Sequence, residues 1–262
     1  MKKVVTQCLF AILMVSSLPS YGKKQDATSW QVQAGSAVLA ADLPWKGIDN
    51  QVTAVPFVQA VYGNWTFGMD MLAKYDFKLA RKSGLGGFAG LSVRDNAYKS
   101  NVSLFQDKST DKVFEGYNTP DTEWVAVAGL NWLWFAFSVE QDISGHSESQ
   151  SYQFSIDLPL YRNDRGLMLK ANLRAHFLSE DYVNYYYGIN QKQENEQVGR
   201  KFYDPASASN YSVSVNLIYP FYQQWALVAE ARHSLLDKSV HDSPLVENDT
   251  MNNLVFTVTY QF

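Results

Sequence analysis

The sequence predicts an all-β protein, a transmembrane antiparallel β-barrel of the outer-membrane type with twelve strands. Of 262 residues, 46% are hydrophobic and 15% aromatic but only 18% are charged, a composition that favours strands over helices. Apolar and polar residues alternate in repeated segments of about ten residues, the pattern of a strand with two different faces. After residue 22 no run of about 18 apolar residues could form a membrane helix, and the net charge of −4 excludes a basic nucleic-acid-binding surface.

Residues 1–22 are expected to be a cleaved signal peptide. Lys2 and Lys3 precede a short apolar stretch, residues 4–15, which is too short to span a bilayer as a helix. The mature protein would be a single domain, residues 23–262, without any cysteine. An exported domain without disulfides needs another source of stability, and a closed sheet in a bilayer provides one.

Twelve segments show the strand pattern. In residues 167–177, for example, apolar side chains occupy every second position, with Lys170 and Arg174 among the polar side chains between them. The polar face would line the lumen, and the apolar face would meet lipid. The strand number is twelve if 65–82 divides into two strands near Leu72. An even number is expected, because both chain ends of a bacterial barrel usually lie in the periplasm, and ten strands are the alternative. The predicted strands are 28–40, 53–62, 65–71, 74–82, 86–95, 121–132, 134–144, 147–158, 166–178, 208–219, 224–235 and 250–262.

The last segment carries the sharpest signal. Leu254, Phe256, Val258, Tyr260 and Phe262 share one face, and a final strand of this kind resembles the signal read by the outer-membrane barrel assembly machinery. The edge strand of a soluble β-sandwich is the alternative. The export signal and the aromatic residues near the strand ends favour the barrel, which would contact outer-membrane lipid and lipopolysaccharide.

The connections differ in length in a way that predicts an orientation. Short connections are typical of periplasmic turns, and long polar ones are typical of outward loops. The short connections are 63–64, 132–133, 161–165 and 220–223. The long connections are 41–52, 96–120, 179–207 and 236–249.

The predicted lumen contains both signs of charge. A selective ion channel usually has a ring of one sign, so the mixture predicts salt bridges that fill the interior, with a narrow solute path as the alternative. For Glu140 and Asp142, salt bridges to Lys170 or Arg174 are expected. The predicted network comprises Glu140, Asp142, Asp157, Lys170, Arg174, Glu230 and Arg232. Further lumenal positions are Asp70, Asp76, Lys74, Lys78, Arg94 and His176.

Candidate catalytic serines have weak support. Ser147 stands between His146 and Glu148, but neighbours on a strand point to opposite faces, so a polar hairpin is expected here. Ser243 follows His241 in a segment of turn-forming residues, which predicts an ordered loop. The sequence shows no metal-ligand spacing and no phosphate-binding loop. A non-enzymatic protein without cofactors is therefore predicted, and an outer-membrane hydrolase is the less favoured alternative.

Several segments, taken together, resemble the MipA/OmpV family, the MltA-interacting outer-membrane proteins. The segments that carry the resemblance are 43–47, 55–57, 182–189, 202–205, 242–246 and 260–262. The motif positions are Tyr185, Tyr186, Gly188, Asp242, Ser243 and Pro244. The resemblance implies an outer-membrane location and a scaffold role for peptidoglycan enzymes, namely a lytic transglycosylase and a bifunctional penicillin-binding synthase.

Residues 182–187 and 242–246 are predicted to be structural elements of the outer rim. Tyrosine rings can lie at the lipid interface while their hydroxyls stay hydrated. Gly188 would let the backbone turn from a strand into the following loop, and Pro244 would stiffen the second segment.

Overall fold

The computed structural model describes residues 29–48, 50–69, 71–80, 83–98, 109 and 111–262. The predicted signal peptide, residues 1–22, and the predicted lumenal Asp70 lie outside the described residues. In the part of the chain that is described, no helix is long and apolar enough to cross a membrane.

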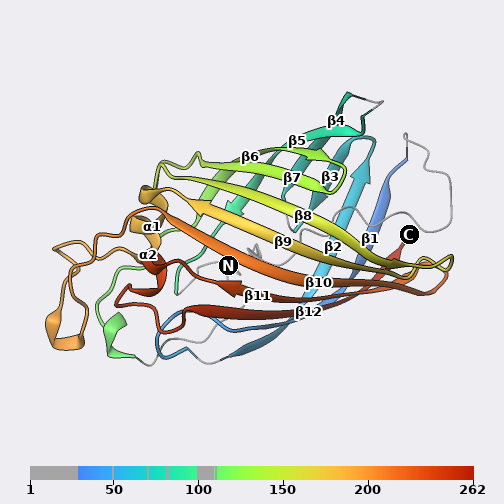
Figure 1. The fold of residues 1–262 in the computed structure, drawn as a ribbon. Coiled ribbons are helices and arrows are strands. Elements are labelled where there is room, and N and C mark those ends of the chain that lie inside the picture. Colours follow the sequence, from blue (N-terminus) through green and yellow to red (C-terminus); the bar gives the residue numbers. More distant parts are fainter. Residues whose placement is uncertain (1–28, 49, 70, 81–82, 99–108, 110) are drawn as a thin grey trace, which may run out of the picture.

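Twelve antiparallel strands form a closed barrel, in which each strand pairs with its neighbours in sequence and the first strand pairs with the last (Figure 1). The strands are β1 (Gln31–Ala41), β2 (Gln51–Tyr62), β3 (Trp65–Gly68), β4 (Ala73–Ala80), β5 (Leu85–Arg94), β6 (Glu123–Trp132), β7 (Phe135–Asp142), β8 (Gln150–Arg162), β9 (Met168–Leu178), β10 (Ala208–Tyr222), β11 (Trp225–Leu235) and β12 (Thr250–Gln261). The fold class and the strand number predicted from the sequence are confirmed, including the division of 65–82 into β3 and β4.

Some predicted strand ends are wrong by a few residues. Strand β8 begins three residues later than expected, because residues 143–149 form a loop in which Gly145 and Glu148 have positive φ. The outward apolar rows of β8 and β10 continue further than predicted, so the turns after them are 163–167 and 223–224. The turn after β6 is 133–134, one residue later than predicted.

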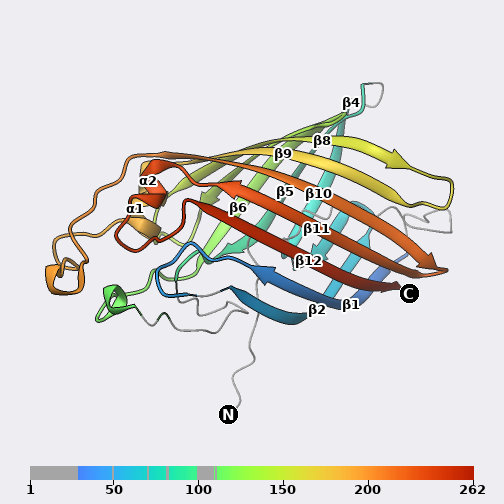
Figure 2. The ribbon, with the colours of Figure 1, turned by 60° about the horizontal axis from the view of Figure 1, so that its bottom comes forward.

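The long connections lie together at one end of the barrel, and the C-terminus lies at the other end (Figures 1 and 2). We call the first the loop end, with connections 42–50, 95–122, 143–149, 179–207 and 236–249, and the second the turn end, with turns 63–64, 133–134, 163–167 and 223–224. The loop-end connections contain the 3₁₀ helices η1 (Lys112–Phe114) and η2 (Glu196–Val198) and the α-helices α1 (Glu180–Tyr187) and α2 (Lys238–His241).

The two faces of each strand differ as the alternation predicts. On β12, Phe256 is 51% exposed on the outer face, whereas Val255 and Thr257 point inward and are buried. The proposed assembly-signal residues Phe256, Val258 and Tyr260 follow this outer row, and Phe262 continues beyond its end. Exposed aromatic side chains gather near the turn end, as in the interfacial girdle of a membrane barrel. They include Tyr62, Trp65, Trp132, Trp134, Phe135, Tyr161, Tyr219, Phe221, Tyr222 and Trp225.

Candidate functional site

Four loop-end connections pack against one another over the barrel mouth. Three of them, 42–50, 95–122 and 179–207, are attached four strands apart in the twelve-stranded ring, so each starts a third of the circumference from the next. Contacts among these three must therefore cross the mouth. Their described parts share one hydrophobic core with 236–249, and we call this assembly the cap. Its buried loop residues are Trp45, Ile48, Val113, Phe114, Tyr117, Tyr182, Val183, Tyr186, Tyr187, Ile189, Val240, Leu245 and Val246.

Direct contacts join the first loop to those that follow β9 and β11. The Trp45 ring stacks on Tyr187, with 5.0 Å between ring centroids. The Lys46 backbone N–H donates to the Leu245 carbonyl oxygen at 3.0 Å. The buried Ser243 hydroxyl donates to the Tyr187 carbonyl oxygen at 2.7 Å. The predicted motif residue Ser243 therefore connects two loops, and its hydroxyl bonds to backbone.

Arg200 joins the loop after β9 to the loop after β5. Its guanidinium donates to the carbonyl oxygens of Val113 and Glu115 and lies 5.6 Å from the Tyr117 ring. It is buried, and hydrogen bonds from a buried cation to carbonyls are stronger than neutral ones. The Tyr185 hydroxyl adds a second connection, since it donates to the Asp121 carbonyl oxygen at 3.1 Å.

The tyrosine-rich segment forms helix α1, and the prediction of a hydrated rim is wrong for it. Tyr182 and Tyr186 lie four residues apart, on one helical face, and are buried in the cap core. Ser179 caps the helix, with its hydroxyl accepting from the Tyr182 N–H at 3.3 Å. Gly188 ends this helix and does not follow a strand. A Cβ at Gly188 would lie 2.5 Å from the Asn184 carbonyl oxygen, so glycine is needed for this close approach.

A buried ion pair lies beneath the helix. Arg94, at the loop end of β5, is 1% exposed, and Glu123, at the start of β6, is fully buried. Arg94 Nε donates to Glu123 Oε2 at 2.8 Å, and the Tyr186 hydroxyl donates to the same oxygen at 2.6 Å. The Ser147 hydroxyl donates to the other carboxylate oxygen, Oε1. Because buried charges are costly unless paired and hydrogen-bonded, these contacts fix the cap to the barrel wall.

Three further groups lie around Arg94. Its Nη2 donates to Ser149 Oγ at 2.6 Å, and its guanidinium carbon lies 4.6 Å from the centre of the Tyr182 ring. Its Nη1 lies 3.9 Å from the Glu140 carboxylate. We call Arg94, Glu123, Glu140 and the tyrosines on them the latch. Sequence reasoning placed Arg94 in the lumen but missed Glu123, although Glu123 falls on the same alternating face as Val125 and Val127.

The salt bridges predicted for Glu140 and Asp142 are wrong. The strand registers place Glu140 level with Leu178 at the far end of β9. Lys170 lies eight residues further along β9, about 26 Å at about 3.3 Å per residue. Asp142 instead accepts hydrogen bonds from the backbone N–H groups of Ser144, Ser147 and Glu148, and so holds the 143–149 loop.

The other residues of the predicted network lie on the inner faces of β8, β9 and β11. Glu230 and Arg232 form a buried salt bridge of 2.5 Å along one strand. The Asn172 amide donates to Asp157 at 3.1 Å. Lys170 and Arg174 lie level with Asn216 and Ser212 on β10. A lumen-filling network of the remaining five residues, without Glu140 and Asp142, stays a prediction.

The cap tyrosines are neutral groups in ordinary conditions. Burial raises the pKa of Tyr182 to about 12, and burial also raises the pKa of Tyr186 and Tyr187. Among the described residues no group of three or more histidine, cysteine or acidic side chains could hold a metal ion. His241 pairs with its neighbour Asp242 at 3.0 Å. The chemistry that the cap supports is packing and hydrogen bonding.

Comparison with known proteins places the chain in a family. The family described as MltA-interacting protein MipA matches residues 34–262. The MltA-interacting protein of Escherichia coli K12 is 24% identical over 238 residues, 87% of this chain and 89% of that protein. The outer membrane protein Omp26La of Vibrio anguillarum is 31% identical over 86 residues, 33% of each chain.

A further relative is also named an outer membrane protein. The putative outer membrane protein YiaT of Escherichia coli K12 is 22% identical over 245 residues, 90% of this chain and 93% of that protein. Among solved structures, Pseudomonas putida OprB aligns with 89% of this chain and 94% of its own, with a TM-score of 0.38 and 9% identity. The family match covers most of the chain and all twelve strands except the first three residues of β1. The chain thus belongs to the family of the MltA-interacting protein MipA and is an outer-membrane β-barrel protein.

Proposed function

We propose that this chain is a non-enzymatic scaffold in the outer membrane that holds peptidoglycan-remodelling enzymes at the membrane surface. The expected partners are a lytic transglycosylase and a penicillin-binding synthase. The name of the Escherichia coli relative, MltA-interacting protein, supports the first of them. The second rests on the resemblance of the sequence to the family.

The observation that carries this proposal over a transport role is the cap. Loops attached a third of the ring apart share a buried core and are tied by Trp45, Arg200 and Ser243. A channel needs a continuous wet path, and a packed apolar layer across one mouth interrupts such a path. A closed, rigid body fits a scaffold better than a pore.

The partner surface would lie at the turn end. Long loops face outward in bacterial barrels and short turns face the periplasm, where peptidoglycan enzymes act. The exposed charges Asp164 and Arg165 stand on the turn between β8 and β9, just beyond the exposed Tyr161 near the end of β8. A partner would bind this polar rim, since the aromatic ring itself meets lipid.

Affinity capture from solubilised envelope tests the scaffold. The native chain should retain a lytic transglycosylase, and reversing the charges at the turn end with Asp164→Lys and Arg165→Glu should weaken its capture severalfold. A matched reversal at the loop end, Lys192→Glu with Glu196→Lys, changes two exposed charges on the other side and should leave capture unchanged. Equal capture by all three proteins, or no capture by the native chain, would contradict the proposal.

A narrow solute path is the second candidate. The charged side chains inside the barrel, including Glu230, Arg232 and Lys170, favour it, because they could line a wet passage below the cap. Planar-bilayer recording of the folded barrel separates the two candidates. Steady single-channel currents from the native chain would favour the path, and their absence together with enzyme capture would favour the scaffold.

A further inference from the structure

Two basic side chains inside the barrel have no salt bridge to any described residue. Lys170 and Arg174 lie on the inner face of β9, where they alternate with outward side chains such as Leu173. The Arg174 Nε is buried and donates no hydrogen bond within the described part of the chain. A buried donor without an acceptor is costly, so a ligand that accepts from Arg174 would gain free energy by binding there.

Four inward-facing acids already have basic partners. Glu230 binds Arg232 at 2.5 Å, and Asp76 binds Lys74 at 3.1 Å. The two acids of the latch lie around Arg94 at the loop end. These acids therefore do not neutralise the two basic side chains on β9.

One more acid, Asp157, lies close to them in register. It is level with Asn172, which stands between Lys170 and Arg174 on the inner face of β9. Its carboxylate accepts from the Asn172 amide at 3.1 Å. A single carboxylate between two basic side chains leaves one positive charge unbalanced on the inner wall of β8 and β9.

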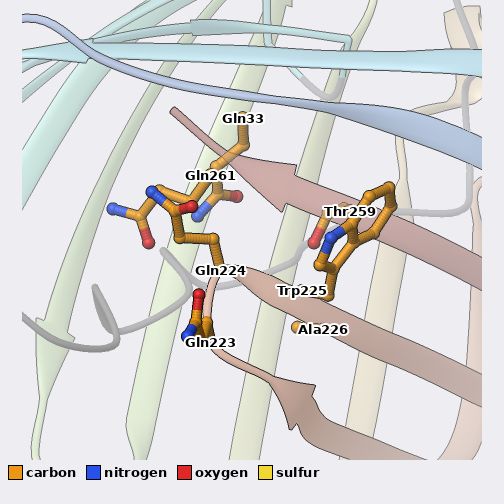
Figure 3. A pocket seen from close by; sticks show the side chains of 7 residues that line it. All are labelled: Gln33, Gln223, Gln224, Trp225, Ala226, Thr259 and Gln261. Atoms are coloured by element: carbon orange, nitrogen blue, oxygen red, sulfur yellow. The ribbon is translucent and has the colours of Figure 1, made fainter.

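The inner wall beyond β11 supplies no counter-charge. Strands β12, β1 and β2 contain no charged residue. Figure 3 shows the uncharged amide side chains of Gln33, Gln224 and Gln261 gathered at the turn end of this wall. The excess positive charge therefore stays on the side of the barrel that β9 forms.

We propose that Arg174 binds a phosphate group inside the barrel. Its register partners are Ser155 on β8 and Ser212 on β10, and both serines occupy inward-facing positions. Their hydroxyls place donors on either side of the guanidinium. A phosphate group has enough oxygens to accept from all three strands, and it pairs with arginine through two parallel hydrogen bonds. A carboxylate has only two oxygens and would use fewer of these donors.

The anion would enter from the turn end, because the cap covers the other mouth. Lys170 stands two residues from the start of β9 at the turn end, and Arg174 lies four residues further, about 13 Å at about 3.3 Å per residue. A positive charge near an entrance raises the local concentration of anions. Lys170 thus attracts the phosphate group and Arg174 binds it. This site does not depend on the scaffold role, since it uses no residue of the turn 163–167.

Titration calorimetry of inorganic phosphate into the folded full-length barrel, in nonionic detergent at constant ionic strength, tests the site. The native chain should bind phosphate at millimolar or lower concentration. Arg174→Gln should bind it about tenfold more weakly, because both the charge and the forked donors are lost. The matched control Arg162→Gln makes the same chemical change at an exposed position near the turn end and should bind as the native chain does.

Two further measurements separate charge from geometry. Arg174→Lys keeps the charge without the fork and should bind phosphate severalfold more weakly than the native chain. Acetate, a carboxylate, should bind the native chain more weakly than phosphate does. Glycerol 3-phosphate identifies the source of the group, since tighter binding than inorganic phosphate supports a phosphate ester and weaker binding supports the free ion.

Heat-modifiable gel mobility shows whether Arg174→Gln still folds, and Ser212→Ala replaces it if it does not, with a severalfold loss expected. No phosphate binding by the native chain, equal binding by the native and Arg174→Gln chains, or equal binding of acetate and phosphate would overturn the proposal. Equal weakening by Arg162→Gln and Arg174→Gln would indicate an adventitious ion only and would overturn it as well.

Discussion

At the scale of single residues, the latch shows how a charge is tolerated inside this barrel. Arg94 is buried but has a carboxylate, a serine hydroxyl and a tyrosine ring within contact distance. Glu123 in turn accepts from Arg94, Tyr186 and Ser147. Arg94 and Glu123 each pair with other groups of the latch. Removing one member therefore leaves its partner buried and unpaired, and this lowers the free energy of unfolding.

Replacing Glu123 by alanine should therefore destabilise the protein strongly. Arg94 would remain buried with Glu140, 3.9 Å away, as its remaining carboxylate partner, and breaking a buried ion pair costs about 3–5 kcal/mol. Tyr186→Phe removes one hydrogen bond to the carboxylate and should cost about 1.5–3 kcal/mol, since hydrogen bonds to charged groups are the stronger ones. Urea unfolding of the refolded barrel in detergent measures both changes. The exposed Glu196 provides the control, since Glu196→Ala should change stability by less than about 0.5 kcal/mol, and equal effects of the two alanine variants would contradict a paired role.

The cap tyrosines predict a dependence on alkaline pH. Burial raises the pKa of Tyr182 to about 12 and that of Tyr117 to about 12, above the ordinary tyrosine value of about 10. A raised folded-state pKa means that the neutral ring is favoured in the folded chain, so its stabilising contribution is complete below pH 10 and is lost as the pH rises toward 12. Absorbance of tyrosinate should show a late-titrating group in the folded protein that the unfolded chain lacks. Tyr182→Phe should lower the absorbance change of this late titration by the amount of one tyrosine. A late absorbance change of unaltered size would show that Tyr182 does not contribute to it.

At the scale of elements, the seam between β1 and β12 depends on a glycine. Gly35 lies opposite Thr259, and a Cβ on it would overlap the Val258 carbonyl oxygen of the neighbouring strand. Only glycine allows the two strands to approach this closely, and these are the strands that close the ring.

Gly35→Ala should lower the yield of folded barrel and its melting temperature, because the strands must separate to admit the methyl group. A suitable control is Gly86→Ala on β5, where the added Cβ would meet its nearest neighbour at an ordinary 3.5 Å. Heat-modifiable gel mobility after refolding measures both. If the two variants fold equally well, the close approach at Gly35 is not needed for closure.

The elements also show what a single sequence can predict. Strands have a period of two that is visible wherever one face meets lipid, so all twelve strands were expected, with their ends misplaced by a few residues. Helix α1 was missed because its tyrosines were assigned to an interface, although their spacing of four fits one helical face. The latch was found only in part, since alternation places Arg94 on the inner face but strand register decides which acid it meets. The register between strands is a tertiary property, and the periodicity of a single strand does not predict it.

At the scale of the whole molecule, the cap and the barrel are stabilised by different interactions. The barrel is held by a closed ring of backbone hydrogen bonds, whereas the cap is held by a small apolar core and by loop-to-loop contacts. Loops can open while strands stay paired, since local opening costs less free energy than global unfolding. The strength of the cap therefore depends on the few residues that cross between loops.

Arg200→Ala should loosen the cap without unfolding the barrel. The variant loses three charge-assisted hydrogen bonds, to the carbonyl oxygens of Gln193, Val113 and Glu115, and the contact with the Tyr117 ring. Hydrogen bonds to charged groups contribute about 1.5–3 kcal/mol. When opening is faster than cleavage, proteolysis follows the open population, so chymotrypsin should cut the cap loops roughly tenfold to a hundredfold faster. Heat-modifiable mobility should stay that of a folded barrel, and Lys192→Ala, an exposed change in the same loop, should be cut at the native rate. Cleavage of Arg200→Ala at the native rate would show that the apolar core alone holds the mouth closed, and faster cleavage accompanied by loss of the folded form would show that cap and barrel unfold together.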